Sequence, residues 1–133
     1  MAGILPNEGE ALVAKLLFKN ADVDRGTNLQ LLLFTNSTIS ETITAATLTE
    51  PTGTDYARKT LTDGSWTVTA DTADYAQQTF TGGVGGWTGS IYGYAIVTTG
   101  TTPRIIAIEV DSNGPYTIGA SDTYKVTPNI TVA

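Results

Sequence analysis

Residues 90–111 read SIYGYAIVTTGTTPRIIAIEVD and carry the clearest fold signal of the chain. Two runs rich in β-branched and aromatic residues, 90–98 and 104–111, are separated by the small residues and proline of 99–103. Such runs favour β-strands, and the stretch between them favours a turn. The sequence therefore predicts an antiparallel hairpin at this point.

The first run of this hairpin is apolar on both faces, which predicts a strand at the centre of a sheet. Alternation of side chains along a strand places Tyr92, Tyr94 and Ile96 on one face. Gly93 would let a neighbouring backbone or ring approach closely. Residues 29–34, LQLLLF, form a second nearly continuous apolar run and predict another strand buried on both faces.

The chain beyond residue 34 follows a plan of short strands divided by turns. The stretch 62–65, TDGS, is the strongest hairpin-turn signal, whereas 38–49 is compatible with a strand or a short helix. Roughly seven to nine strands, about ten residues apart, predict a mainly β fold, an antiparallel β-sandwich or flattened barrel. Further strands are expected at 56–62, 66–70, 75–81, 116–118 and 123–132.

One α-helix is predicted, at residues 7–19, after an extended arm at 1–6. Asn7 suits an N-cap, and the two glutamates that follow suit the positive end of the helix dipole. Leu12 and Leu16 define an apolar stripe, which neighbouring apolar residues widen over most of the circumference. We therefore expect the helix to be buried against the sheet or against a neighbouring subunit.

The chain has 133 residues and a formal net charge of −6, with 25 threonines and 14 glycines. A chain of this length is expected to form one domain, residues 1–133. Because Lys and Arg are few and scattered, we expect no binding to nucleic acid. No apolar run reaches the ~18 residues that a membrane-spanning helix needs, and the N-terminus lacks the pattern of a signal peptide. We therefore expect no membrane partner.

The sequence contains no histidine and no cysteine. It therefore lacks the commonest general base, the commonest metal ligand and the thiol nucleophile, and we expect no enzyme activity, metal or cofactor. Two carboxylates alone can serve a glycosidase, and the spacing allows Asp71 with Asp74 or Glu109 with Asp111. We interpret both pairs as ordinary solvated residues. The polar loop 20–28 lacks the closing glutamate of a calcium loop and is also interpreted as solvated.

Two positions in the strand region are candidates for contact with other molecules. Trp87 follows the glycine-rich loop 82–86 and is the aromatic residue most expected to be exposed; with Tyr116 it could form a sugar-stacking surface. Arg58 could donate a salt bridge to another subunit, although an ordinary exposed strand arginine is the simpler interpretation. The bland interpretation of most other aromatic residues is core filling.

Several short motifs occur in a fixed order along most of the chain. An N-terminal helix precedes an apolar strand that ends in LLFTN, and the later motifs are EPTG at 50–53, YAR at 56–58, WTV at 66–68, QTF at 78–80, IYGY at 91–94 and YKVTP at 124–128. In this order and spacing the chain resembles a family of small structural proteins of tailed bacteriophages, described as head-decoration, minor structural or tail-fibre proteins. The YAR and KVTP motifs are the most specific.

This resemblance implies a virion component without enzymatic activity. We expect a capsid decoration (cement) protein, made in the host cytoplasm, that binds the major capsid protein on the outer phage head as a homo-oligomer. Ile4 and Leu5 in the arm, with Leu12 and Leu16 in the helix, are the expected contacts with the capsid or a neighbouring copy. The alternatives are a tail, neck or fibre-base component, or a small carbohydrate-binding module for host attachment.

Overall fold

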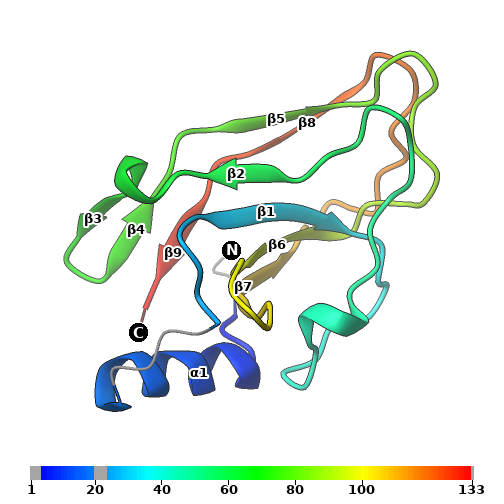
Figure 1. Ribbon diagram of the computed structural model, residues 1–133. Helices are drawn as coiled ribbons and strands as arrows, with labels where there is room; N and C mark the ends of the chain where they lie inside the picture. Colours follow the sequence, from blue (N-terminus) through cyan, green and yellow to red (C-terminus); the bar gives the residue numbers. More distant parts are fainter. Residues whose placement is uncertain (1–3, 20–23, 133) are drawn as a thin grey trace.

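The computed structural model describes residues 4–19 and 24–132 (Figure 1). The fold is mainly β, with antiparallel sheets and one N-terminal α-helix, which confirms the predicted fold class. In chain order the elements are α1 (Asn7–Ala14), the π-helix η1 (Lys15–Lys19), β1 (Leu29–Phe34), the 3₁₀ turn η2 (Ala45–Thr47), β2 (Lys59–Leu61), the 3₁₀ turn η3 (Asp63–Ser65), β3 (Thr67–Thr69), β4 (Thr72–Asp74), β5 (Gln78–Thr81), β6 (Gly93–Val97), β7 (Ile105–Val110), β8 (Thr123–Val126) and β9 (Asn129–Thr131).

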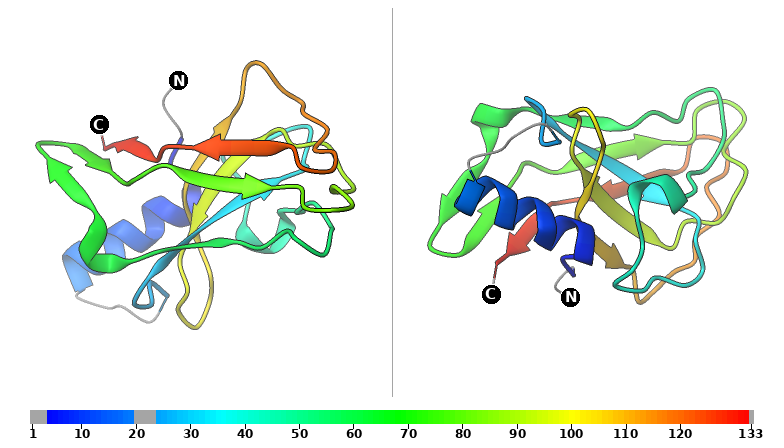
Figure 2. Two further views of the ribbon diagram at one scale, coloured as in Figure 1. Left: turned by 90° about the horizontal axis from the view of Figure 1, so that it is seen from above. Right: turned by 60° about the horizontal axis from the view of Figure 1, so that its bottom comes forward.

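The described strands form three antiparallel sheets. The largest has the order β2-β1-β6-β7, and the smaller ones are β3-β4-β9 and the pair β5-β8. In Figure 1 the β5-β8 pair lies above the four-stranded sheet and α1 lies below it. Figure 2 shows the same layers from two further directions, with β5 and β8 side by side. The sheets thus form a sandwich-like arrangement and do not close into a barrel over the described residues.

The hairpin predicted from residues 90–111 is present as β6 and β7, with Ala95 opposite Ile108. Every residue of β6 is buried, and the strand lies between β1 and β7, as expected for a central strand. Gly93 has the predicted close neighbours: a β-carbon there would meet the backbone of Glu109 and the ring of Phe34. The tight packing of this sheet therefore depends on a glycine at position 93.

β1 has an apolar core on each face, because its side chains alternate between two clusters. Leu31 and Leu33 pack with Phe80 and other residues of the upper layer. Leu32 and Phe34 pack on the opposite face, under a segment that includes Ile39. That cover comes from 38–49, the stretch whose type the sequence left open; it is neither a strand nor an α-helix and contains a turn at 41–42 and the 3₁₀ turn η2.

The helix spans 7–19 as predicted, although its last five residues adopt the wider π form. The carbonyl of Pro6 accepts hydrogen bonds from the backbone N–H groups of Gly9 and Glu10, at 2.8 and 3.0 Å. Pro6 is therefore the N-cap, and the prediction of Asn7 in that role is wrong. Gly9 is buried where the helix crosses β7, since a β-carbon there would meet the backbone of Ile105.

Two predictions, a hairpin turn and a single closing strand, are wrong because the chain passes from one sheet to another at these places. The TDGS turn at 62–65 forms η3 and leads from β2 in one sheet to β3 in another, so it closes no hairpin. The closing strand predicted at 123–132 is two strands, β8 paired with β5 and β9 paired with β4. Pro128, which has no N–H to donate, lies at the break between them.

One predicted strand face is also wrong. Tyr94 and Ile96 lie in the upper cluster, as alternation requires. Tyr92 packs against the lower cluster with Phe34, on the opposite face. The cause is an irregular strand start, since Ile91 pairs with Tyr116 in an isolated bridge before β6 begins. A local irregularity of this kind reverses which face the preceding side chains occupy.

Candidate functional site

The N-terminal helix is held to the sheet by a buried carboxylate. Glu8 Oε1 accepts hydrogen bonds from the backbone N–H groups of Ile105 and Ala45, at 2.6 and 2.9 Å. Its other oxygen, Oε2, lies 3.8 Å from Nη1 of Arg104, and only 8% of the Glu8 side chain is exposed. One side chain therefore connects the first turn of α1 to β7 and to η2.

Asp24 extends this anchor toward the end of the helix. Its carboxylate accepts from Arg104 Nε at 3.3 Å and lies 3.7 Å from Nζ of Lys15. Only 4% of Asp24 is exposed, so the prediction of a solvated loop is wrong at this residue. Residues 20–23 of that predicted loop lie outside the described residues. Arg104 lies between the buried carboxylates of Glu8 and Asp24, and this pairing fixes the orientation of the helix relative to the sheet.

The far end of the helix exposes a cluster of large apolar side chains. Leu17 is 74% exposed, Phe18 87% and Val13 36%. Val13 and Leu17 are four positions apart, so they are neighbours on the helix surface, and Phe18 follows directly in the π turn. We call Val13, Leu17 and Phe18 the helix-end surface. Large apolar side chains are seldom exposed together on a protein surface, and such patches mark interaction sites.

Both predicted contact residues of the helix lie on its inward side. Leu12 is 3% exposed and Leu16 is half-buried, so both pack within the chain. The expectation of a buried helix therefore holds for one face only. The predicted apolar stripe was too broad, because it included apolar residues on the exposed face. Helical spacing marked the apolar positions but not which side meets the sheet.

The predicted N-terminal arm is attached to the sheet at its described end. Ile4 exchanges two backbone hydrogen bonds with Ile108, of 2.8 and 3.0 Å, and so adds one residue pair to the free edge of β7. Its side chain is 42% exposed, whereas Leu5 is half-buried close to Gly9. Residues 1–3 of the arm lie outside the described residues.

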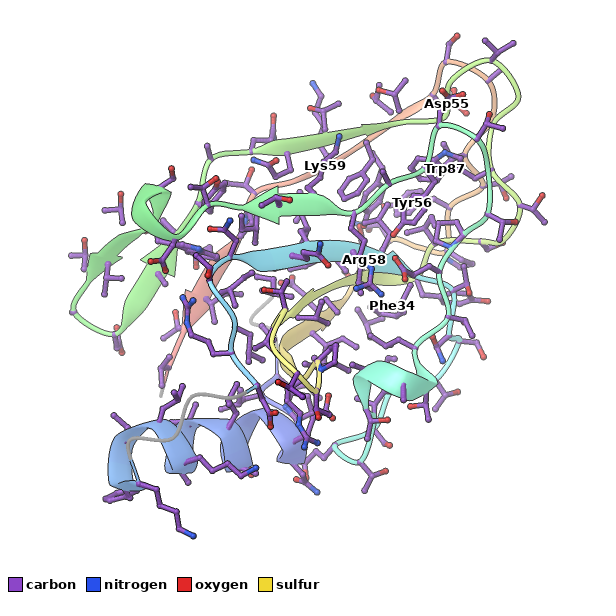
Figure 3. All side chains as sticks on the ribbon, in the orientation of Figure 1. Phe34, Asp55, Tyr56, Arg58, Lys59 and Trp87 are labelled. Atoms are coloured by element: carbon purple, nitrogen blue, oxygen red, sulfur yellow. The ribbon has the colours of Figure 1, made fainter. Side chains whose placement is uncertain are left out.

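Arg58 is paired within its own chain. Its guanidinium donates to both carboxylate oxygens of Glu50, at 2.8 to 3.2 Å, and to the side chain of Gln30 at 3.2 Å. Glu50 also accepts a 2.8 Å hydrogen bond from the Tyr56 hydroxyl. Figure 3 shows Arg58 beside Tyr56. Arg58 therefore needs no salt-bridge partner on another subunit, because its guanidinium N–H groups already bind Glu50 in a bidentate arrangement.

Trp87 is 7% exposed, so its prediction as an exposed contact is wrong. The glycine loop before it folds back through a 2.8 Å hydrogen bond from Gly86 N–H to the Gly82 carbonyl, and Gly86 has a φ of +69°. The tryptophan ring then turns inward and meets Tyr56 edge-on, with centroids 5.2 Å apart (Figure 3). The exposed apolar residue of this loop is Val84, at 93%.

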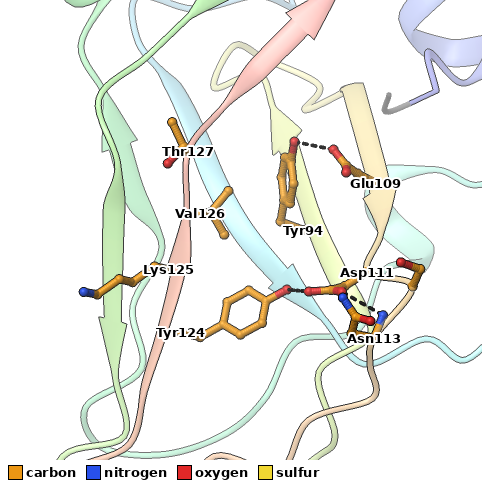
Figure 4. A pocket seen from close by; sticks show the side chains of 9 residues that line it. Tyr94, Glu109, Asp111, Asn113, Tyr124, Lys125, Val126 and Thr127 are labelled. Atoms are coloured by element: carbon orange, nitrogen blue, oxygen red, sulfur yellow. Dashed lines mark hydrogen bonds between the residues drawn. The ribbon is translucent and has the colours of Figure 1, made fainter. Parts of the chain in front are cut away.

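A polar groove lies where the end of β7 faces β8 (Figure 4). It has a volume of about 320 Å³, and its walls carry Tyr94 and Glu109 from the large sheet and Tyr124 from β8. The Tyr94 hydroxyl donates to Glu109 Oε2 at 2.7 Å, and the Tyr124 hydroxyl donates to Asp111 Oδ2 at 2.9 Å. The carboxylates at 109 and 111 thus line one hollow, and each holds a tyrosine.

The tyrosine hydroxyls of this groove remain protonated over the ordinary pH range. Burial raises the pKa of Tyr94 above its usual value of 10.0, and the Glu109 carboxylate adds to the effect. Burial likewise raises the pKa of Tyr124, and Asp111 raises it further. A phenol beside a carboxylate would have to lose its proton against a negative charge, so the two groups stay as donor and acceptor.

The other acidic pair suggested by the sequence has a structural explanation. Asp74 accepts a hydrogen bond from the Asn129 side chain of the adjacent strand, and Asp71 accepts one from the Thr72 hydroxyl at 3.3 Å. Among residues 4–19 and 24–132, no group of three or more acidic side chains is placed to hold a metal ion. In the same ranges no helix is long and apolar enough to cross a membrane.

Comparison of the chain with protein-family models, with curated proteins and with solved structures found no match. The resemblance to phage structural proteins therefore stays a prediction from the motifs quoted above.

Proposed function

We propose that this protein is a non-enzymatic structural component of a tailed-bacteriophage virion, and specifically a decoration protein that binds the outer surface of the head. The observation that supports this most is the helix-end surface on a rigidly anchored helix. Val13, Leu17 and Phe18 offer apolar area to a partner, while Glu8 and Asp24 fix the helix against the sheet. A preformed surface loses little freedom on binding, which favours affinity.

The proposed partner is the major capsid protein in its assembled lattice. A protein that binds only the assembled shell stabilises it by mass action, in proportion to occupancy, and needs no chemistry of its own. β7 is an edge strand of the four-stranded sheet, and the part of its edge that Ile4 and Glu8 leave uncovered would extend the contact. A second copy of the chain bound at the same edge would give the proposed homo-oligomer.

The test is binding to heads that lack the protein. Purified chain is mixed with such heads and the pellet after centrifugation is assayed for bound protein. Leu17→Asp with Phe18→Asp should lower occupancy at least tenfold, because charges would be buried at the contact. The control is Val84→Asp, which adds a charge at an even more exposed apolar residue in the glycine loop and should bind normally.

Full occupancy by the Leu17→Asp, Phe18→Asp variant would refute the helix-end surface as the contact. Location separates head from tail: cryo-electron microscopy of the virion should show density for this chain repeated over the shell. Density confined to the neck, tail or fibre base would reject the decoration role in favour of a tail component.

A further inference from the structure

The polar groove beside β7 extends past Tyr124 into a second hollow. The second hollow has a volume of about 650 Å³ and shares Asp111, Tyr124 and Lys125 with the first. Small-molecule sites usually have volumes of about 300–1,000 Å³. Because the Tyr124 ring lies between two adjoining hollows, the surface suits an extended ligand with several units better than a single compact one.

The walls of the groove present acceptor atoms whose positions are fixed. Each tyrosine proton is committed to a carboxylate, including that of Tyr116, whose hydroxyl lies 3.4 Å from Asp111 Oδ1. The backbone N–H of Asn113 donates to the same Asp111 oxygen at 3.0 Å. A phenol that donates to a carboxylate still accepts through its own oxygen. The groove therefore suits a ligand rich in O–H donors.

Packing alone does not require this network. Phenylalanine would fill the same space without a hydroxyl, and buried polar groups cost stability unless each is paired. Here Tyr94 and Tyr124, from separate strands, bond to carboxylates at a hollow that is open to solvent, and Tyr116 reaches Asp111 from the adjoining hollow. Tyr116 and Tyr124 are both partly exposed, and their rings contact each other with centroids 5.5 Å apart and planes at 60°. Such rings pack against the C–H faces of sugars while their polar ends stay hydrogen-bonded.

Charge limits the class of ligand that the groove can bind. Asp111 and Asp122 line the hollows, and Lys125 is the one cation among the described lining residues. Figure 4 shows the Lys125 side chain pointing away from Tyr94 and Glu109. Phosphate, sulfate and acidic sugars would meet net negative charge and are disfavoured. Hydrolysis is disfavoured too, since both oxygens of Asp111 already accept hydrogen bonds and neither is free to pass a proton to a leaving group.

We propose that this groove, built from Tyr94, Glu109, Asp111, Tyr116 and Tyr124, binds a neutral oligosaccharide without cleaving it. Tyr124 stands at the centre of the site, because it lines both hollows. The proposal is independent of the head contact, since it uses none of the residues of the helix-end surface.

The test is titration of the ¹⁵N-labelled full chain with neutral trisaccharides of glucose, N-acetylglucosamine, galactose and mannose, followed by two-dimensional NMR. At least one should give saturable shifts at residues around Tyr124, with dissociation constants tighter than about 10 mM. Tyr124→Phe keeps the ring and should weaken that binding about tenfold. Tyr75→Phe, which removes a hydroxyl outside the groove, is the matched control and should bind as wild type.

No saturable shift with any of the four trisaccharides would overturn the proposal, as would shifts that leave the groove unaffected. Tighter binding of sialyllactose than of lactose would overturn its neutral-ligand part. The Leu17→Asp, Phe18→Asp variant should bind saccharide normally, so loss of head binding and loss of saccharide binding are separate results. The trisaccharide should remain intact after long incubation with the protein, which would confirm that no glycosidic bond is cut.

Discussion

Glu8 provides the sharpest test of how the helix is held. Replacing it with alanine would remove the carboxylate oxygen that accepts hydrogen bonds from the backbone N–H groups of Ala45 and Ile105. An unsatisfied buried donor costs about 1–3 kcal/mol, so Glu8→Ala, which leaves two such donors, should lower the free energy of unfolding by about 2–6 kcal/mol. Arg104 would keep Asp24 as a partner, so its 3.8 Å pair with Glu8 adds little to that figure.

Two further variants separate the sources of this effect. Glu8→Gln keeps an acceptor oxygen and loses the charge, so it should cost about half as much as Glu8→Ala or less. Glu10→Ala removes an exposed acid from the same turn and should change stability by no more than about 0.5 kcal/mol. The control matters because both acids interact favourably with the N-terminal end of the helix dipole.

The assay is urea unfolding followed by tryptophan fluorescence and circular dichroism. With a slope of about 1–3 kcal/mol per molar urea, the Glu8→Ala variant should shift its midpoint by roughly 1 M or more. A cost below about 1 kcal/mol would refute the reasoning, because it would mean that the two N–H groups find water or another acceptor. The same variant should also bind heads less well than its fraction folded predicts, since the helix-end surface would lose its fixed position.

Two other predictions concern the aromatic residues. Trp87→Ala should cost about 3–5 kcal/mol because it empties a buried site beside Tyr56, and thermal melting that shows a loss below about 1 kcal/mol would contradict its burial. Tyr94 and Tyr124 have pKa values raised by folding, so the stability they contribute is complete below the unfolded value of about 10 and is lost as pH rises above it. Urea unfolding between about pH 8 and pH 11 should show this loss, with a shallower decline in Tyr94→Phe; an equal decline in both proteins would contradict the assignment.

The strand core could be predicted because its signal is local. β1 and β6 are continuous apolar runs, and a run of that kind is stable only when both faces are covered. The sequence also predicts close approach at Gly93, where a β-carbon would meet the backbone of Glu109 and the ring of Phe34 in the adjacent strands. These features depend on residues adjacent in sequence, where alternation and composition decide the outcome.

The errors arose where distant contacts decide the conformation. Trp87 follows five residues that include four glycines, a composition typical of an exposed loop. It is buried because that loop closes on itself and its backbone N–H bonds to the carbonyl of Ile118 at 2.9 Å. Thr62-Asp63 looked like a hairpin turn, yet the Asp63 N–H donates to Asn28 and its carboxylate pairs with Arg25, which fixes the chain as it changes sheets. Neither partner is visible in a local window.

The groove shows which part of a site escapes sequence reasoning. Spacing alone placed Glu109 and Asp111 near one another, and it could not give them partners. Strand register supplies those: β6 and β7 pair so that Tyr94 lies opposite Glu109, and β8 crosses so that Tyr124 reaches Asp111. A one-residue slip in the β6-β7 pairing or in the β5-β8 pairing would point these side chains to opposite faces of their sheets. Replacing the tyrosine hydroxyls would remove no buried hydrophobic side chain from the groove, so core packing does not depend on them. The strand register serves core packing. The hydroxyl network is an additional constraint, which the saccharide proposal explains.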